Sequence, residues 1–323
     1  LRPPDAPALA RLLEHSARLA GRNDRLALWF TAVADVLQEA DRLAEKAQRS
    51  TIKVKDVDDA LEQRRRRHDL IERRTQEALD DGLTLLETAG SRVGVINALV
   101  VHDTPDQAFA RPTRVTVTVS LGREGLVDIE RKAELSGESH HKGVQIISGL
   151  LRERYAQDKP LALTASICFE QSYAHVDGDS ASMGELVAVI SALADAPIAQ
   201  NWAMTGSINQ KGEIQPVGDV NAKIEGFYDA CLARGLTGKQ GVLIPEANTG
   251  DLMLRDDVVK AVTKGRFHVA AVKQLDDALE LLTGVPAGAR PGLGESYAEG
   301  SLNRRADARL THYAEAARRY RRG

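Results

Sequence analysis

Two residues in the second half of the chain have the side-chain types of a nucleophile and a base. Ser180 lies in "HVDGDSASMGEL", after an Asp-Gly-Asp run, and Lys223 lies 43 residues later in "GDVNAKIEGFYDACLARG". A serine hydroxyl is a weak nucleophile until a base removes its proton, and a neutral lysine amine can act as that base. The two residue types therefore raise the hypothesis of a Ser-Lys dyad.

The position of Lys223 in its segment bears on this hypothesis. Apolar residues at helical spacing predict a helix with Asp219 at its N-cap and Gly235 at its end. Lys223 follows Val220 by three residues, so it falls on the inward stripe. Burial penalises the ammonium form and would lower the lysine pKa from its ordinary value of about 10.4. The alternative is a lysine whose stem packs while its ammonium reaches water.

Ser180 also has simpler interpretations. The hydroxyl of Ser180 or of Ser182 could cap the helix that follows. A hydrolase nucleophile elbow requires a glycine where this chain has Ser182. A Ser-His-Asp triad would have to recruit His175, His268 or His102, and a lone histidine is more often structural than a base. Asp177 and Asp179 have the spacing of two calcium ligands, but Ala181 occupies the next ligand position. An EF-hand is therefore excluded, and no metal site is expected.

The elements around these residues predict an α/β (α+β) domain over residues 81–285. Strands are predicted by "VGVINALVV", by the alternating "TRVTVTVSL", and by "LALTASICFEQS", "GVLIP" and "HVAAV". The stripe from Met183 to Ala194, "HKGVQIISGLLRERYA" and "LDDALELLTG" have the spacing of amphipathic helices, and Gly284 is expected to end the last of them. The first of these helices would directly follow Ser180.

The two ends of the chain differ from this middle part. Residues 1–80 are rich in Ala, Leu, Glu and Arg and predict a small all-helical domain, in which Ile52 and Val54 alternate like a short strand and Asp56 caps the next helix. Residues 286–323 have the composition of a linker followed by a basic, helical C-terminal extension. We expect the clustered arginines of both ends to be solvated.

Composition excludes several classes of protein. The 323 residues, 43% apolar and 28% charged with a net charge of −3, indicate about two soluble domains with no overall preference for an acidic partner. Cys168 and Cys231 stand far apart without a C-x-x-C motif, which favours a reducing, cytoplasmic location. No stretch approaches the roughly 20 apolar residues of a membrane span. The chain begins at Leu1, and we expect it to be a fragment of a longer protein.

Several motifs surround the candidate dyad. "VDGDSASMGEL", "AMTG" and "PVGD" follow one another before Lys223, and "GVINAL" and "LSGESHHKGVQII" lie upstream, the former with Ala98 where a glycine is usual. Together they resemble the proteolytic domain of the Lon protease family, in the variant typified by archaeal, B-type enzymes. The resemblance covers roughly residues 85–284, and residues 1–80 are similar to the small AAA+ ATPase lid that precedes this protease.

This resemblance implies a fold, an assembly and a site. The fold would be related to the second domain of ribosomal protein S5, and the chain would assemble into a hexameric ring that hydrolyses unfolded or damaged polypeptides. Ser180 would be the nucleophile and Lys223 the general base, with Thr205 beside the lysine amine and Asp177 and Asp179 in the acidic run. Because a carboxylate at Asp179 could pair with Lys223 and raise its pKa, a self-inhibited site is one expectation.

The sequence also bears on nucleotide binding and on an alternative function. The chain has no G-x-x-x-x-G-K-[ST] motif, so no cofactor is expected here, whereas ATP and Mg²⁺ are expected for a full-length enzyme. The alternative function is a non-catalytic, Lon-like assembly domain whose basic tail contacts nucleic acid. The joint presence of Ser180, Lys223 and Thr205 favours the protease.

Overall fold

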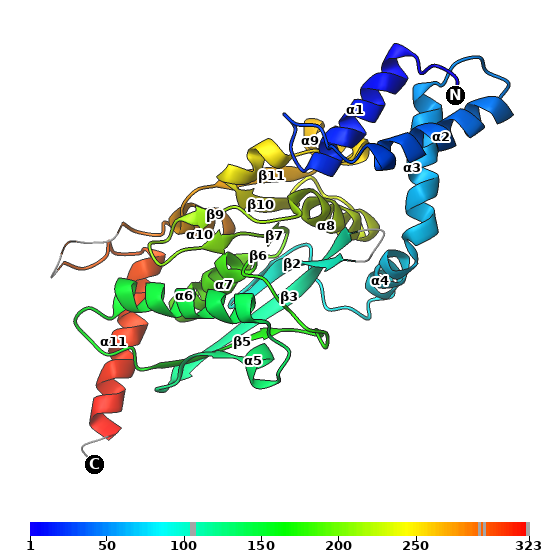
Figure 1. Ribbon diagram of the computed structural model, residues 1–323. Coiled ribbons are helices and arrows are strands. Elements are labelled where there is room, and N and C mark those ends of the chain that lie inside the picture. Colours follow the sequence, from blue (N-terminus) through cyan, green and yellow to red (C-terminus); the bar gives the residue numbers. More distant parts are fainter. Residues whose placement is uncertain (104–107, 290–291, 293–294, 321–323) are drawn as a thin grey trace.

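The computed structural model describes residues 1–103, 108–289, 292 and 295–320. Four helices form the N-terminal part: α1 (Ala6–Ala20), α2 (Phe30–Lys46), α3 (Val54–His68) and α4 (Leu70–Asp80). The first three pack around a small apolar core of their own, and they lie at one end of the molecule (Figure 1). The expected strand at Ile52 and Val54 is wrong: Ile52 makes a single bridge to Pro4, and Val54 already begins α3.

The start of α3 follows from a capping box. The carboxylate of Asp56 accepts a hydrogen bond from the backbone N–H of Lys53 at 2.9 Å, which satisfies a donor that the helix leaves free. Asp56 therefore stabilises the helix from its first turn and is not the N-cap itself.

A seven-stranded mixed sheet forms the centre of the second part, with the order β11-β10-β7-β2-β3-β5-β4. Its strands are β2 (Val95–Asp103), β3 (Ala108–Leu121), β4 (Gly125–Asp128), β5 (Leu163–Phe169), β7 (Trp202–Met204), β10 (Gly241–Pro245) and β11 (His268–Val272). β3 is antiparallel to both β2 and β5, and the remaining neighbours are parallel. Two short pairs flank it: β1 (Ser91–Arg92) with β6 (Ile198–Ala199), and β8 (Ser207–Ile208) with β9 (Ile214–Gln215).

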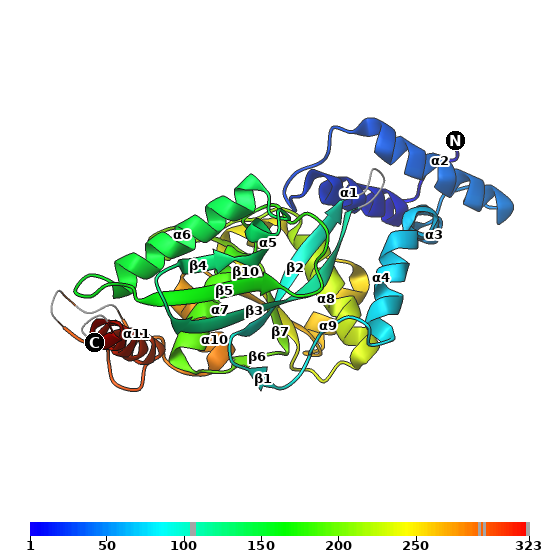
Figure 2. The ribbon, with the colours of Figure 1, turned by 90° about the horizontal axis from the view of Figure 1, so that it is seen from below.

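Helices cover both faces of this sheet (Figures 1 and 2). They are α5 (Ile129–Lys132), α6 (Glu138–Tyr155), α7 (Ser182–Ala194), α8 (Val220–Arg234), α9 (Asp256–Thr263), α10 (Leu275–Thr283) and α11 (Leu302–Tyr320), with a 3₁₀ turn, η1, at Glu246–Asp251. Alternation along β2 explains the two layers, because Ile96 packs in the core with α7 and Leu99 packs in the core with α8.

The C-terminal extension packs into the larger core. Leu302, Ala306 and Leu310 of α11 are buried in the same cluster as α7, and the hydroxyl of Tyr155 donates to Asn303 Oδ1 at 2.6 Å. Only part of α11 is therefore the solvated face that its arginines indicated. Among the described residues, no helix has the length and apolarity needed to cross a membrane.

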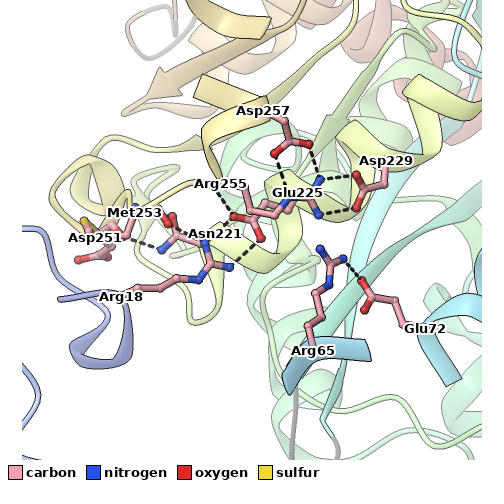
Figure 3. Close-up of polar contacts among 10 residues, drawn as sticks. All are labelled: Arg18, Arg65, Glu72, Asn221, Glu225, Asp229, Asp251, Met253, Arg255 and Asp257. Carbon is pink, nitrogen blue, oxygen red and sulfur yellow. Dashed lines mark hydrogen bonds and ion pairs between the residues drawn. The ribbon is translucent and has the colours of Figure 1, made fainter. Parts of the chain in front are cut away.

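Ion pairs join the N-terminal helices to the second part (Figure 3). The guanidinium of Arg18, on α1, donates to both carboxylate oxygens of Glu225, on α8, at 2.6 and 2.7 Å, and to the carbonyl of Met253 at 2.7 Å. Arg255 donates to the carboxylates of Asp229 and Asp257 beside this contact. α8 is thus one of the elements on which the two parts of the chain meet, together with η1, where the Asn23 N–H donates to the Gly250 carbonyl.

Candidate functional site

The backbone at Ser180 is fixed by the residues that follow β7. The Ser180 carbonyl accepts hydrogen bonds from the Gly206 N–H at 2.8 Å and from the Thr205 hydroxyl at 3.2 Å. In return, the Met183 N–H donates to the Gly206 carbonyl at 3.1 Å. The segment before α7 is therefore tied to the sheet, while the Ser180 side chain is partly exposed.

The interpretation of this serine region as a helix cap is wrong. α7 begins at Ser182 after Ala181, and no side chain caps it. The Ser182 hydroxyl instead accepts from the Ile208 N–H at 3.2 Å, because the β8–β9 pair packs against the start of the helix. Ser180 therefore has no role in satisfying the helix N-terminus.

The two aspartates of the acidic run have different partners. Asp179 Oδ2 accepts from the Ser207 hydroxyl at 2.7 Å. Asp177 Oδ1 accepts from the N–H groups of Ser139 and His140 at 3.1 and 3.2 Å, at the start of α6. Asp177 thus anchors the serine loop to α6, whereas Asp179 is anchored to β8. Ser207 was not among the sequence-predicted residues, and its place two residues after Thr205 is the signal that could have found it.

The approach of Asp177 to α6 requires a glycine at position 137. A Cβ atom there would lie 2.2 Å from Asp177 Cγ, well inside van der Waals contact. The hydrogen bond from Gly178 N–H, together with those from α6, stabilises the ionised form and holds the pKa of Asp177 below its usual range.

Lys223 lies on the buried face of α8 and is 3% exposed. Val220, Ile224 and Phe227 on the same face are also buried, so the inward prediction is confirmed and the interpretation as a lysine reaching water is wrong. Burial lowers the pKa of Lys223 to about 8, although the charges of Asp219 and Asp179 act in the opposite direction. Asp179 therefore raises the pKa as expected, but desolvation outweighs it.

The loop before Lys223 is held by Asn248 of η1. Its side chain accepts from the Val217 N–H and donates to the Val217 carbonyl, both at 2.9 Å. Asp219 occupies the N-cap position of α8 with a left-handed backbone (φ 57°) and no side-chain capping bond, and Gly235 ends the helix as predicted. These two hydrogen bonds to Val217 hold the backbone where the chain enters α8, and they therefore help to orient Lys223.

Asp179, the residue before Ser180, lies close enough to Lys223 for its charge to act on the lysine amine. Within the part of the chain that the structure describes, neither the Ser180 hydroxyl nor the Lys223 amine has a hydrogen bond or an ion pair, so the two are not bonded to each other. Catalytic hydrogen bonds are often long before substrate binds. The Thr205 hydroxyl is bonded to the Ser180 carbonyl and not to the Lys223 amine.

Backbone donors are available next to the serine. The Ser182 and Met183 N–H groups are already used, by the carbonyls of Asp179 and Gly206 respectively. Among the described residues, the N–H groups of Ser180 and Ala181 have no acceptor. These two groups are the ones that could stabilise a negative oxygen at this position.

A cavity of about 900 Å³ lies elsewhere, at the junction of the two parts of the chain. Arg18, Glu225 and Arg255 line it, and neither Ser180 nor Lys223 does. This cavity at the junction is therefore separate from the candidate dyad.

Comparison with known proteins assigns both parts of the chain. Residues 3–67 match the family model of the archaeal LonB AAA+ ATPase lid domain, and residues 152–284 match that of the Lon protease (S16) C-terminal proteolytic domain. These matches cover α1, α2 and nearly all of α3, and the segment that carries Ser180, Thr205 and Lys223.

Curated relatives agree with these matches. A candidate Lon protease homologue of Escherichia coli (strain K12) is 50% identical over 215 residues, which is 66% of this chain and 36% of the relative. The archaeal Lon protease of Thermococcus kodakarensis is 31% identical over 197 residues, 61% of this chain and 28% of the relative. The chain thus spans about a third of the length of such relatives. With a lid of the archaeal type before its Lon proteolytic domain, the chain belongs to the Lon protease family.

Proposed function

We propose that this chain is the proteolytic part of a serine endopeptidase in which Ser180 is the nucleophile and Lys223 the general base. The observation that carries the proposal is the burial of Lys223, which lowers its pKa to about 8. An ordinary lysine is almost wholly protonated at neutral pH, whereas a lysine with this pKa has a usable neutral fraction. A purely structural position on an apolar helix face would be better filled by an apolar side chain.

The reaction would proceed through an acyl-enzyme. The neutral amine of Lys223 takes the proton of the Ser180 hydroxyl while Ser180 Oγ attacks the peptide carbonyl. The N–H groups of Ser180 and Ala181 stabilise the oxyanion, and the ammonium of Lys223 then protonates the leaving amine. Water, activated by the same amine, hydrolyses the ester and restores the serine.

Thr205 and Asp179 would position this pair. The bond from the Thr205 hydroxyl to the Ser180 carbonyl holds the serine backbone in place. The bond from the Ser207 hydroxyl keeps Asp179 turned toward β8, so that its carboxylate influences Lys223 through charge without a direct bond. Asp179 therefore raises the pKa of Lys223 without forming an ion pair with it, which supports a site in which the lysine amine is basic enough to accept a proton but is less often neutral.

The wider assignments rest on membership of the family. We propose that the fold is related to the second domain of ribosomal protein S5 and that the chain works in a cytoplasmic, ring-shaped hexamer on unfolded or damaged polypeptides. ATP and Mg²⁺ would act on an ATPase core to which the N-terminal lid belongs. Light scattering of the purified chain tests the ring, with a mass of six chains as the expected result.

Cleavage and labelling of the full chain test the dyad. The wild type should cleave casein and become labelled at Ser180 by a serine-reactive fluorophosphonate, and Ser180→Ala and Lys223→Ala should lose both activities. Ser182→Ala is the matched control, because this serine is two residues away and bonded to Ile208. Casein cleavage by Ser180→Ala at the wild-type rate would refute the assignment. A salt-sensitive DNA shift without cleavage would favour the nucleic-acid alternative.

A further inference from the structure

A second group of chemically reactive side chains lies inside the proteolytic domain. It consists of Asp128 at the end of β4, Glu130 on α5, His140 on α6 and Glu185 on α7, and each of these residues is at most 6% exposed. β4, β5, α5 and α6 lie together at one edge of the sheet (Figure 2). Three carboxyl groups and one imidazole are costly to bury without a compensating cation.

The geometry of three of these residues is that of a ligand set. One oxygen each of Asp128 and Glu130 and one ring nitrogen of His140 lie within 4.8 Å of one another. Asp128 Oδ2 is 3.6 Å from His140 Nε2, which is too long for a hydrogen bond. The 3.6 Å separation is close to that of two ligand atoms that each lie about 2.0–2.2 Å from one shared metal ion.

One oxygen of each carboxylate accepts a hydrogen bond from a backbone donor. Asp128 Oδ1 accepts from the Arg131 N–H at 3.2 Å, and Glu130 Oε1 accepts from the Phe169 N–H at 2.8 Å. The second oxygen of each group, Asp128 Oδ2 and Glu130 Oε2, is buried without a hydrogen-bond partner in the described structure, as is His140 Nε2. Each of the three residues therefore has one buried ligand atom without a partner, and the three residues bring one ligand atom each within 4.8 Å of the others.

Glu185 completes the arrangement from the other side of the imidazole. Its Oε1 lies 3.6 Å from His140 Nδ1, and His140 also packs edge-on against the Phe169 ring. In metal sites a carboxylate commonly accepts the second N–H of a ligating histidine, which fixes the tautomer and the ring orientation. At 3.6 Å Glu185 Oε1 is not hydrogen-bonded to Nδ1 and is itself buried without a partner in the described structure, but it lies next to the position that such a carboxylate occupies.

We propose that Asp128, Glu130 and His140 bind a divalent transition-metal ion of the zinc or manganese class, with Glu185 orienting His140. The nitrogen and two oxygens form a donor set that suits these ions. The ion would join β4 and α5 to α6 and, through Glu185, to α7, the helix that begins two residues after Ser180. Asp177 also binds the first turn of α6. The ion would therefore stabilise the packing of α6 and α7, the two helices next to the serine loop.

A proton is the competing occupant of this cluster. Burial lowers the pKa of His140, but the carboxylates of Asp128 and Glu185 more than offset it and raise the value to about 9. An imidazolium would satisfy the same charges without any metal, so the experiment must separate the two occupants.

Metal content of the full chain separates them. Wild-type protein is stripped with a chelator and dialysed against Zn²⁺ or Mn²⁺ buffered at low micromolar free concentration, and bound metal is measured by mass spectrometry. We expect about one ion per chain in the wild type and a loss of at least about fivefold in Asp128→Asn and His140→Gln. His175→Gln is the control, since His175 is exposed and should leave the content unchanged.

Thermal unfolding of the wild type gives an independent readout that needs no variant to fold. An ion that binds only the folded chain raises the melting temperature, and the rise should disappear with chelator and in His140→Gln. Wild-type protein that takes up neither ion and melts at the same temperature with and without them would overturn the proposal in favour of the imidazolium. Equal uptake by the wild type and both ligand variants would overturn it as well.

Discussion

The hydroxyl of Thr205 donates to the carbonyl of Ser180 at 3.2 Å, so a buried residue after β7 fixes the residue proposed as nucleophile. Removing this hydroxyl should cost about 1 kcal/mol of stability, because the Ser180 carbonyl keeps only its bond from Gly206. We expect Thr205→Val to cleave casein more slowly than wild type, and Thr205→Ser to retain most of the rate. A Thr205→Ser variant as slow as Thr205→Val would argue against the hydrogen bond as the cause.

The pKa of Lys223 predicts the pH dependence of cleavage. Lys223 acts in its neutral form, and burial lowers its pKa to about 8. The rate kcat/KM should therefore rise about tenfold from pH 7 to a plateau above the lysine pKa. A pH series with a fluorogenic peptide checks this, and a rate that is flat from pH 6 to pH 9 would contradict the role of Lys223.

Charge at Asp179 should set the position of this profile. The Asp179 carboxylate raises the pKa of Lys223, so Asp179→Asn should move the midpoint to lower pH while its amide oxygen still accepts from Ser207. At neutral pH the variant should then be faster than wild type. Asp195→Asn is the control, because it removes a carboxylate charge at the far end of α7, and Asn also tolerates the left-handed backbone at this position. If the wild type is faster at every pH, Asp179 does not restrain the site.

Replacing Lys223 by an apolar residue should make the protein more stable and inactive. The folded pKa of about 8 is lower than the ordinary 10.5, so the unfolded chain binds the proton more tightly. The penalty is full below the folded pKa and vanishes as pH rises past the unfolded value. Lys223→Met should therefore gain up to about 3 kcal/mol at pH 7 and much less at pH 10.5.

Denaturant unfolding at the two pH values measures this gain. Lys264→Met is the control, since Lys264 is exposed at the end of α9, and its stability should stay within about 0.5 kcal/mol of wild type. A Lys223→Met variant that is less stable than wild type at neutral pH would show that the lysine is not penalised by burial.

The bidentate pair between Arg18 and Glu225 should couple the lid to the helix that carries Lys223. Arg18→Met leaves the buried Glu225 carboxylate with the Arg255 N–H as its remaining donor and should cost about 1–3 kcal/mol. Arg22→Met removes an arginine whose pairs, with Asp24 and at 3.7 Å with Asp251, are partly exposed, and it should cost less than about 1 kcal/mol. Chemical unfolding and proteolysis between α4 and β1 measure the difference, and equal losses in both variants would exclude a special role for Arg18.

Most secondary structure followed from local patterns, and the exceptions have physical causes. Gly284, for example, ends α10 in the left-handed conformation that its position predicts. The stripe from Met183 to Ala194 predicted one buried face, but every residue of α7 is buried, because α11 covers the side that would otherwise meet water. The periodicity of a helix reports its own apolar residues and cannot report a distant helix that packs on it.

The sequence alone determined the family, the alternation of strands and helices, and the inward position of Lys223, because residue spacing within one element fixes the face on which a side chain lies. Only the tertiary structure decided which groups act on that lysine and on Ser180. It also assembled Asp128, Glu130, His140 and Glu185, which are up to 57 residues apart and which no single motif brings together. Folding buries these charges together in a medium of low polarity, and their pKa values and ligand geometry depend on that shared environment.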